Sequence, residues 1–393
     1  MERTSVVERA LRAAEPHLLL DVVTAALREQ YGADRVDLRL ADYGLISLQS
    51  VSTLPLDAEG VSIHGSPQGR AFGAQAPHVV SLPNSPTVIV HLPVTARGDR
   101  MGVLSVTMPR ERFDQSVLPE MAHVCAALGH EILVADRDTD LYKLARRASR
   151  LTLAAEMQWQ LLPGGALSRP EFALGAHLEP AYAIFGDNYD WSCSSDHLTL
   201  TVTNGMGSGI EAALLTNLTI NALRNARRAG TSLADQAALA DQAVYAQYRG
   251  SAYVSVLLLR FDLATGEVEA VDAGSPRLWR QRDAVVEHVG FDAQLPLGMF
   301  EDTVYTAERF RVEPGDRLLI SSDGVYNTKS ASGELYGERA LARALAASRL
   351  LPPTQVPSAV LRELAAYRGE TPLDDDALVL CLDWHGRPGA TPA

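Results

Sequence analysis

Cysteine is scarce in this sequence of 393 residues, which contains only Cys125, Cys193 and Cys381. Three cysteines so far apart cannot form a disulfide framework, and they are too few for a cysteine-rich zinc site. Long apolar runs are also missing, since no stretch approaches the roughly 18 residues that a membrane-spanning helix needs. The start, MERTSVVERALRAAEPHLLLDVV, lacks the apolar core and cleavage site of a signal peptide. We therefore expect a cytoplasmic protein without a membrane segment.

Basic residues are outnumbered: Lys and Arg total 35 against 48 for Asp and Glu, a net charge of −13. Proteins that bind nucleic acids or anionic membranes usually carry an excess of Lys and Arg, so the charge argues against both partners. It remains compatible with a small acidic pocket that binds cations. The hydrophobic content of 47% is that of a folded protein, and the length predicts two domains with connectors.

The first part of the chain has the pattern of a compact α+β unit. Helical spacing of apolar residues covers residues 1–30, and short alternating runs such as VDLRLAD, LISLQSV and TVIVHLPVTA then predict strands. LPEMAHVCAALGHEILVA returns to helical spacing. We take residues 1–137 as one domain. Its segments GSPQGRAFGAQAPHVV and VHLPVTARGDRMGVLSVTMP resemble a GAF-type sensor domain over residues 17–137, which implies a regulatory role but no particular ligand.

Residues 138–163 are predicted to form a linker helix that ends at Pro163. Its apolar positions alternate at steps of three and four residues: Leu141, Leu144, Ala148, Leu151, Ala155 and Leu162. One interpretation is a connector that lies on its own domain. The other is a helix that pairs with its copy in a homodimer and carries signals between domains.

From Phe172 onward, strand patterns dominate, and two helical stretches at 211–228 and 233–248 interrupt them. Amphipathic helices among mainly antiparallel strands indicate a sandwich with sheets inside and helices outside. We assign residues 164–385 to this second domain and residues 386–393 to a disordered tail. The fold class expected for the whole chain is therefore α+β.

Aspartates stand at the ends of several of these apolar strands. Asp323 follows RLLIS, the run Asp374, Asp375 and Asp376 precedes ALVLCL, and Asp187 lies in FGDNYDW. Carboxylates at strand ends can converge at one edge of a sheet, and an oxygen-only ligand set suits Mg²⁺ or Mn²⁺ better than zinc. Two such ions can activate one water for attack on phosphorus. Taken singly, each Asp is more readily interpreted as a solvated turn residue.

Taken in order, the motifs carry a resemblance. EPAYAIFGDNYDW, TNGMGSGIEAALL, VDAGSPRL, LPLGM, GDRLLISSDGVYN and DDDALVLCL resemble the SpoIIE/RsbU-like branch of PPM-type serine/threonine phosphatases over residues 150–385. The resemblance implies a β-sandwich flanked by helices and a dinuclear Mn²⁺ or Mg²⁺ centre. It also implies hydrolysis of phosphoserine on a regulatory protein, typically an anti-sigma-factor antagonist, under the control of the sensor domain.

The same resemblance implies a set of site residues by position. Asp187 and Asp323 fall on metal ligands, and Gly205 falls on the residue that supplies a backbone carbonyl. The last ligand falls on Asp374 or Asp375, with Asp374 favoured.

The bridging Asp of the family falls on Asn204, which completes the catalytic candidates with Asp187 and Asp323. An amide offers one neutral oxygen to two dications, so metal occupancy should fall. The chain departs from the family pattern at three further positions: Phe185, Ser275 and Asn327. Two hypotheses stay open: a metal-dependent phosphatase with weakened metal binding, and a pseudophosphatase that binds a phosphoprotein or other partner without turnover.

Overall fold

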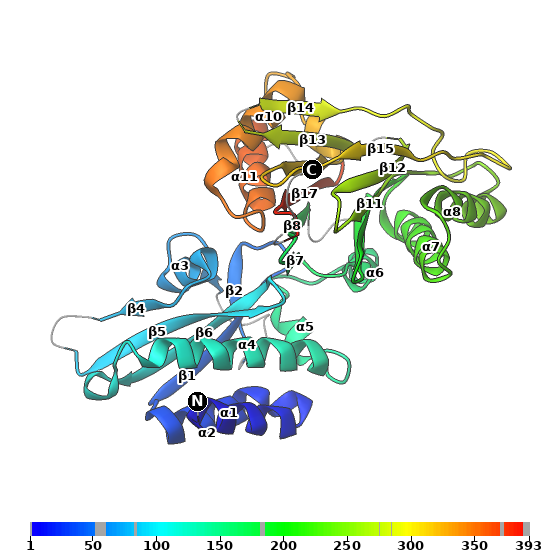
Figure 1. Ribbon diagram of the computed structural model, residues 1–393. Helices are drawn as coiled ribbons and strands as arrows, with labels where there is room; N and C mark the ends of the chain where they lie inside the picture. Colours follow the sequence, from blue (N-terminus) through cyan, green and yellow to red (C-terminus); the bar gives the residue numbers. More distant parts are fainter. Residues whose placement is uncertain are drawn as a thin grey trace. The chain divides into compact units, whose positions relative to one another are not determined.

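The structure is a computed structural model that describes residues 2–51, 60–81, 85–180, 185–274, 276–283, 285–369 and 373–387 (Figure 1). Ser275 and most of the expected tail, residues 388–393, lie outside the described residues. The chain divides into two compact units, Met1–Arg150 and Leu151–Ala393. This division falls inside the segment that was predicted to be a linker.

Unit 1 contains one antiparallel sheet with the strand order β3-β2-β1-β6-β5-β4. The strands are β1 (Arg35–Ala41), β2 (Ser47–Ser50), β3 (Val61–Ser62), β4 (His78–Val80), β5 (Thr87–Ala96) and β6 (Asp99–Pro109). The polar loop at Arg97 and Gly98 joins β5 to β6 as a hairpin. Both residues have positive φ, which suits a tight turn.

The helices of unit 1 are α1 (Glu2–Ala13), α2 (Leu19–Tyr31), α3 (Pro67–Ala74), α4 (Val117–Ala135) and α5 (Leu141–Ala145), with 3₁₀ turns η1 (Pro16–Leu18) and η3 (Arg110–Arg112). The helix predicted over residues 1–30 is thus two helices, because Pro16 opens a new turn between them. By length and composition alone, α4 would also suit a membrane span, contrary to the expectation that no stretch of the chain is long and apolar enough. Its buried face, including Val124, Leu128 and Ile132, lies in the core of unit 1.

The prediction of a single linker helix over residues 138–163 is wrong. The structure has α5 and then α6 (Leu153–Leu161), with non-helical residues between them. The backbone at Arg146 is held by unit 1 instead: its carbonyl accepts the Tyr43 N–H at 3.0 Å, and its Nε donates to the Ala41 carbonyl at 3.2 Å. A new helix then starts at Thr152, whose hydroxyl accepts the Ala155 N–H. These local bonds outweigh the apolar repeat.

Unit 2 is the predicted sandwich of two antiparallel sheets. The first has the order β15-β12-β11-β10-β9, and the second β14-β13-β16-β17-β8-β7. The strands are β7 (Ala166–Arg169), β8 (Phe172–Glu179), β9 (Asn188–Cys193), β10 (His197–Gly205), β11 (Val254–Asp262), β12 (Glu267–Ala273), β13 (Arg277–Arg282), β14 (Val285–Val289), β15 (Glu308–Arg311), β16 (Arg317–Ser321) and β17 (Ala377–Trp384).

Helices cover both outer faces of the sandwich (Figure 1). They are α7 (Gly209–Arg228) and α8 (Leu233–Tyr248) on the first sheet, and α10 (Gly337–Ala347) and α11 (Val356–Arg368) on the second, with α9 (Asp323–Tyr326) and η4 (Ser348–Leu350) in the connections. Alternate residues of the strands, such as Leu200, Leu259 and Leu380, fill the core between the sheets. The predicted sandwich and the two helices predicted at 211–228 and 233–248 are confirmed, whereas α10 and α11 were not predicted.

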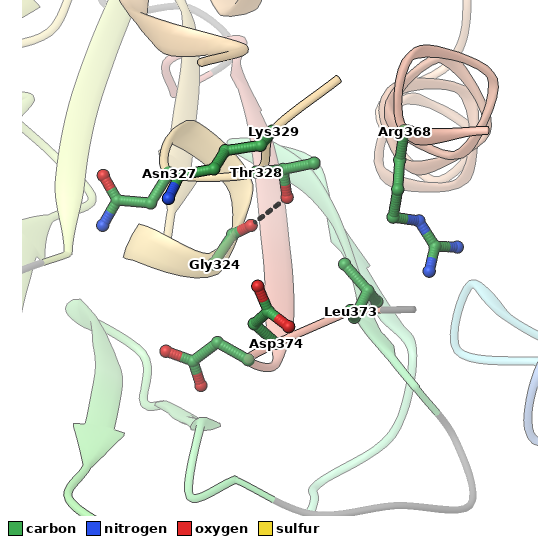
Figure 2. Close-up of a pocket in the computed structure, with 8 residues that line it drawn as sticks. Gly324, Asn327, Thr328, Lys329, Arg368, Leu373 and Asp374 are labelled. Atoms are coloured by element: carbon green, nitrogen blue, oxygen red, sulfur yellow. Dashed lines mark hydrogen bonds between the residues drawn. The ribbon is translucent and has the colours of Figure 1, made fainter. Parts of the chain in front are cut away.

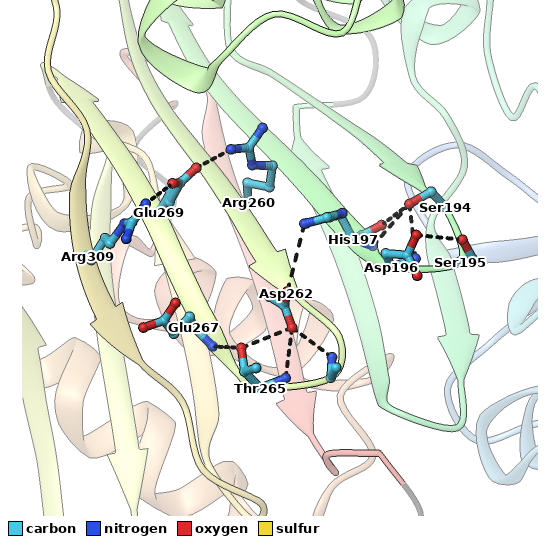
Figure 3. Close-up of polar contacts among 11 residues, drawn as sticks. Ser194, Ser195, Asp196, His197, Arg260, Asp262, Thr265, Glu267, Glu269 and Arg309 are labelled. Carbon is cyan, nitrogen blue, oxygen red and sulfur yellow. Dashed lines mark hydrogen bonds and ion pairs between the residues drawn. The ribbon is translucent and has the colours of Figure 1, made fainter.

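One end of the sandwich is closed by hairpins, which we call the hairpin end (Figure 3). In the β11–β12 turn, the Asp262 carboxylate accepts N–H groups from Ala264 at 2.9 Å and Thr265 at 2.8 Å. His197 from the β9–β10 hairpin lies 3.9 Å from the same carboxylate. The strand ends at the other end of the sandwich carry the predicted site residues.

Candidate functional site

Four segments bring the predicted site residues to one end of the sandwich, which we call the site end. Asn204 lies near the end of β10, and Asp187 immediately precedes β9, which pairs with β10. Asp323 begins α9 directly after β16, and Asp376 immediately precedes β17, which pairs with β16. Because antiparallel neighbours alternate in direction, the end of one strand and the start of the next lie together.

Asn204 and Asp323 are in direct contact across the two sheets. The Asn204 side-chain amide donates a hydrogen bond from Nδ2 to Asp323 Oδ1. Burial raises the pKa of Asp323, while hydrogen bonds from its own backbone, from Gly324 and from Asn204 oppose this rise. This hydrogen bond therefore uses the Asp323 oxygen that a cation shared by the two residues would require. The structure places Asn204 at the predicted position and gives it the role of a donor.

Asp187 and Asp376 form a second contact, and both side chains are almost completely buried. Asp376 Oδ2 accepts the N–H groups of Phe185 at 2.9 Å and Asp187 at 3.1 Å. Within the described part of the chain, Asp376 Oδ1 and Asp187 Oδ2 have no hydrogen-bond partner. Two buried carboxylates with unsatisfied oxygens are costly unless a proton or a cation neutralises them.

The electrostatics of this acidic cluster support that conclusion. Burial raises the pKa of Asp187 well above its ordinary value, and the charge of Asp376 adds to the effect. Burial likewise raises the pKa of Asp376, although backbone N–H groups partly offset it. The pKa of Asp375 is also raised, by burial and by the charge of Asp323. The site end thus holds more carboxyl groups than can be ionised together without a counter-ion.

Of the three consecutive aspartates selected from the sequence, the structure places Asp376 in the buried cluster, although Asp374 or Asp375 was expected there. Asp374 and Asp375 line a small cavity beside the cluster, whereas the Asp376 carboxylate is buried and accepts the Asp187 N–H. The sequence contained a signal for this, because Asp376 directly precedes the buried run ALVLCL and is therefore the first of the three to enter the sheet.

Gly186 fixes the loop that carries Asp187. Its φ is +112°, and an added Cβ would lie 2.3 Å from the carbonyl oxygen of Gly205. The carbonyl of Gly186 accepts the Gly205 N–H at 3.2 Å and the Thr216 hydroxyl at 2.8 Å. Only glycine fits this conformation and this close approach. Phe185 is tolerated at the preceding position because the cluster uses only its backbone N–H.

Two residues missed by the sequence analysis support the same loop. The Gln158 side chain, from α6, donates from Nε2 to the Asp187 carbonyl at 2.6 Å and is itself buried. Thr216, from α7, is the hydroxyl donor to Gly186. Neither stands in a motif of charged residues, so only the tertiary contacts reveal them. They show that α6 belongs to the site end of unit 2.

A cavity of 70 Å³ opens beside the acidic cluster (Figure 2). Asp374 and Asp375 are among the residues that line it. Asn327 and Lys329 come from the segment after α9, and Arg368 comes from the end of α11. This cavity therefore combines acidic and basic side chains next to the cluster.

The donor set fits a hard cation only in part. The carboxylate oxygens of Asp187, Asp376 and Asp375 are the ligand type that Mg²⁺ and Mn²⁺ prefer. In the described residues, however, no three His, Cys, Asp or Glu side chains are arranged as a group that could hold a metal ion. Asn204 fits a bridging position poorly, because its NH₂ group faces Asp323.

Comparisons with known proteins agree with this architecture. Residues 194–385 match the sequence model of the family described as Stage II sporulation protein E (SpoIIE). The phosphoserine phosphatase RsbP of Bacillus subtilis (strain 168) is 25% identical over 147 residues, which is 36% of this chain and 36% of RsbP. The phosphoserine phosphatase RsbU of the same organism is 22% identical over 192 residues, 48% of this chain and 56% of RsbU. The chain thus matches little more than half the length of RsbU, and less of RsbP.

A solved structure supports the fold. The SiaA-PP2C domain of Pseudomonas aeruginosa aligns with a TM-score of 0.51 at 22% identity, covering 59% of this chain and 94% of that chain. The family match itself lies within unit 2.

Proposed function

The C-terminal unit of this chain is a SpoIIE-family PP2C-type phosphatase domain, and from this premise we propose that the chain is a metal-dependent protein serine/threonine phosphatase. Its substrate in this proposal is a phosphorylated regulatory protein. The observation that carries the proposal is the acidic cluster at the site end, where Asp187 and Asp376 are buried together with unsatisfied oxygens.

The electrostatics favour cation binding over an empty cluster. A phosphate group carries about two negative charges at neutral pH, so four nearby carboxylates would repel it. A counter-ion that offsets the acids would therefore favour the approach of phosphate. A bound Mg²⁺ or Mn²⁺ would offset them and supply an activated water. Asp187 and Asp376 would hold the ion, and Gly186 and Gln158 would keep the Asp187 loop in place.

The substrate and the regulation follow from the architecture by analogy. RsbP and RsbU are phosphoserine phosphatases, and we extend that substrate class to this chain, with an anti-sigma-factor antagonist as the expected phosphoprotein. In this proposal unit 1 is a GAF-type sensor that controls unit 2 in the cytoplasm. A homodimer through the segment 138–163 would now have to use two short helices, and sedimentation of the full chain tests it.

A second candidate is a pseudophosphatase, and the Asn204–Asp323 hydrogen bond favours it. An amide at the bridging position removes one negative charge and directs a donor into the site. If this change abolishes ion binding, the domain would keep the fold and bind a protein partner without hydrolysing a phosphate.

Replacing the amide with a carboxylate, Asn204→Asp, tests both candidates. We expect the variant to bind Mn²⁺ more tightly and to hydrolyse p-nitrophenyl phosphate about 10- to 100-fold faster than the unmodified chain, in the range of effects seen when metal-site groups are changed. Calorimetric titration and turnover in Mn²⁺ provide the two readouts.

The unmodified chain decides between the candidates. Measurable Mn²⁺-dependent turnover, lost on chelation, supports the phosphatase. No turnover above background in either form, together with no Mn²⁺ binding, would reject the phosphatase and leave the pseudophosphatase. Asn221→Asp, an exposed position on α7 away from the site end, controls for the added charge.

A further inference from the structure

The cavity beside the acidic cluster is lined by two basic residues, Lys329 and Arg368, as well as by aspartates (Figure 2). Lys329 follows α9, and Arg368 lies in the last turn of α11. Arg368 Nε is buried and has no hydrogen-bond partner within the described part of the chain. A buried guanidinium donor without an acceptor is costly, so it marks a place where an anionic acceptor would be stabilised.

Asn327 adds a neutral donor to the same cavity. Its exposed amide can donate to an anion, which a carboxylate at this position could not do. Thr328 fixes the segment between Asn327 and Lys329, because its hydroxyl donates to the Gly324 carbonyl at 2.6 Å. The donors therefore stand on a backbone that is anchored to α9.

The size of the cavity suits a phosphate group. A volume of 70 Å³ holds roughly five water-sized groups, and a phosphate has five heavy atoms. An arginine fork and a lysine ammonium are the side chains that most often bind phosphate oxygens. A larger ligand would have to extend outward, as a peptide that carries a phosphorylated side chain does.

Charge determines when this cavity accepts an anion. Without a cation, Lys329 and Arg368 are balanced by Asp374 and Asp375, and the cavity is close to neutral. A divalent cation held by Asp187 and Asp376 would add up to two positive charges next to this cavity, less the protons that these two acids release when the ion binds. Binding of cation and of phosphate must then strengthen each other by the same factor, because the coupling between two ligands is reciprocal.

We propose that Asn327, Lys329 and Arg368 form the phosphate-binding pocket in which the phosphorylated side chain of the substrate docks beside the acidic cluster. This inference rests on the proposed function for its substrate class, and it assigns the recognition of phosphate to residues outside the acidic cluster.

Calorimetric titration of the full chain with free phosphoserine, in the presence and absence of Mg²⁺, tests the pocket. We expect Arg368→Gln and Lys329→Met each to weaken phosphoserine binding about tenfold, since each removes a charge-assisted hydrogen bond. Unphosphorylated serine should not bind measurably to any form. Mg²⁺ should tighten phosphoserine binding in the unmodified chain, and this gain should shrink in both variants.

Arg349→Gln is the matched control, because Arg349 is an exposed arginine of unit 2 that lines a different cavity, near Arg317 and Asp383. It should bind phosphoserine like the unmodified chain. If Arg368→Gln fails to fold, Lys329→Met still tests the pocket, since the Lys329 side chain is exposed. Unchanged affinity in Lys329→Met and Arg368→Gln would overturn the proposal.

The outcome also separates this inference from the proposed function. If the unmodified chain binds phosphoserine through these residues but shows no turnover, the phosphatase proposal fails and the pocket stands. If it hydrolyses p-nitrophenyl phosphate and both variants keep the KM of the unmodified chain, the phosphatase stands and the pocket is rejected. A rise in KM with little change in kcat supports both.

Discussion

The site end and the hairpin end of the sandwich in unit 2 treat charge in opposite ways. At the hairpin end, Arg317 binds Asp383 through two hydrogen bonds of 2.6 and 2.8 Å and also donates to two backbone carbonyls. Arg282 similarly binds Asp316 at 2.7 and 2.8 Å. At the site end, Asp187 and Asp376 are buried against each other instead of against cations.

The difference separates stability from function. A buried charge with a partner in good geometry is tolerated by the fold, and breaking such a pair is strongly destabilising. Buried like charges with unsatisfied oxygens do not stabilise the native state, and they persist where a ligand completes them. We therefore assign the hairpin end to stability and the site end to binding.

The largest effect is expected at the hairpin end. Arg317→Met should lower the free energy of unfolding by about 3–5 kcal/mol, because it leaves the Asp383 carboxylate and two carbonyls without their donor. Urea unfolding of the full chain measures it. Mn²⁺ and phosphoserine binding should be unchanged in the folded fraction. A loss below about 1 kcal/mol would contradict the assignment of this end to stability.

At the site end we expect a smaller loss of stability but a complete loss of Mn²⁺ binding. Gly186→Ala forces a Cβ against the Gly205 carbonyl at a positive φ, which should cost about 2–4 kcal/mol and displace Asp187. Mn²⁺ binding by calorimetry should be lost. Gly207→Ala is the control, because Gly207 also has a positive φ but nothing lies within 4 Å of an added Cβ. Equal effects of the two substitutions would exclude the contact as the cause.

The smallest effect is a difference in pH dependence between the ends. Asp272 lies toward the site end of β12, where burial raises its pKa to about 6, with a backbone hydrogen bond from Gly274 opposing and Glu308 adding. Asp262 lies in the hairpin turn, where backbone and hydroxyl groups of Thr265 and the N–H of Ala264 outweigh burial and lower its pKa.

These shifts have opposite consequences. For Asp272 the native state holds the proton more tightly than the unfolded chain, so its contribution to stability is full below about pH 4 and is lost as pH rises through 6. Asp272→Asn should therefore gain stability relative to the unmodified chain between pH 4 and 7, by up to about 1 kcal/mol. Asp262→Asn should be less stable than the unmodified chain above pH 4, and this difference should disappear at lower pH. Thermal unfolding across this pH range measures both, and parallel curves would contradict the contrast.

Much of unit 2 could be predicted from the sequence. The apolar alternation of LTLTVTN and VSVLLLRFD identified β10 and β11, and the helical stretches at 211–228 and 233–248 correspond to α7 and α8. These predictions hold because local periodicity and burial on a sheet agree there. The segment 138–163 shows the limit of such predictions. The Arg146 side chain donates to the Ala41 carbonyl of β1 and the Arg146 carbonyl accepts the Tyr43 N–H, and these bonds override the apolar repeat.

The candidate site divides in the same way. Aspartates at strand ends are visible in the sequence, because a strand pattern shows where each strand stops. Among the three consecutive aspartates the sequence analysis favoured Asp374, whereas the structure turns Asp376 inward, the residue directly before the buried run ALVLCL. The sequence gives no sign that Gln158 and Thr216 hold the Asp187 loop, because each side chain donates to a backbone carbonyl of a distant segment.

The sequence by itself determined several strands of unit 2, the helices α7 and α8, the acidic residues at the strand ends and the amide at position 204, since each depends on local pattern or residue type. Only the tertiary structure decided which charges meet. It buried Asp187 against Asp376, turned the Asn204 amide toward Asp323 and set Lys329 and Arg368 around one cavity. Such pairings depend on how distant strand ends pack together, and no local sequence pattern encodes that packing.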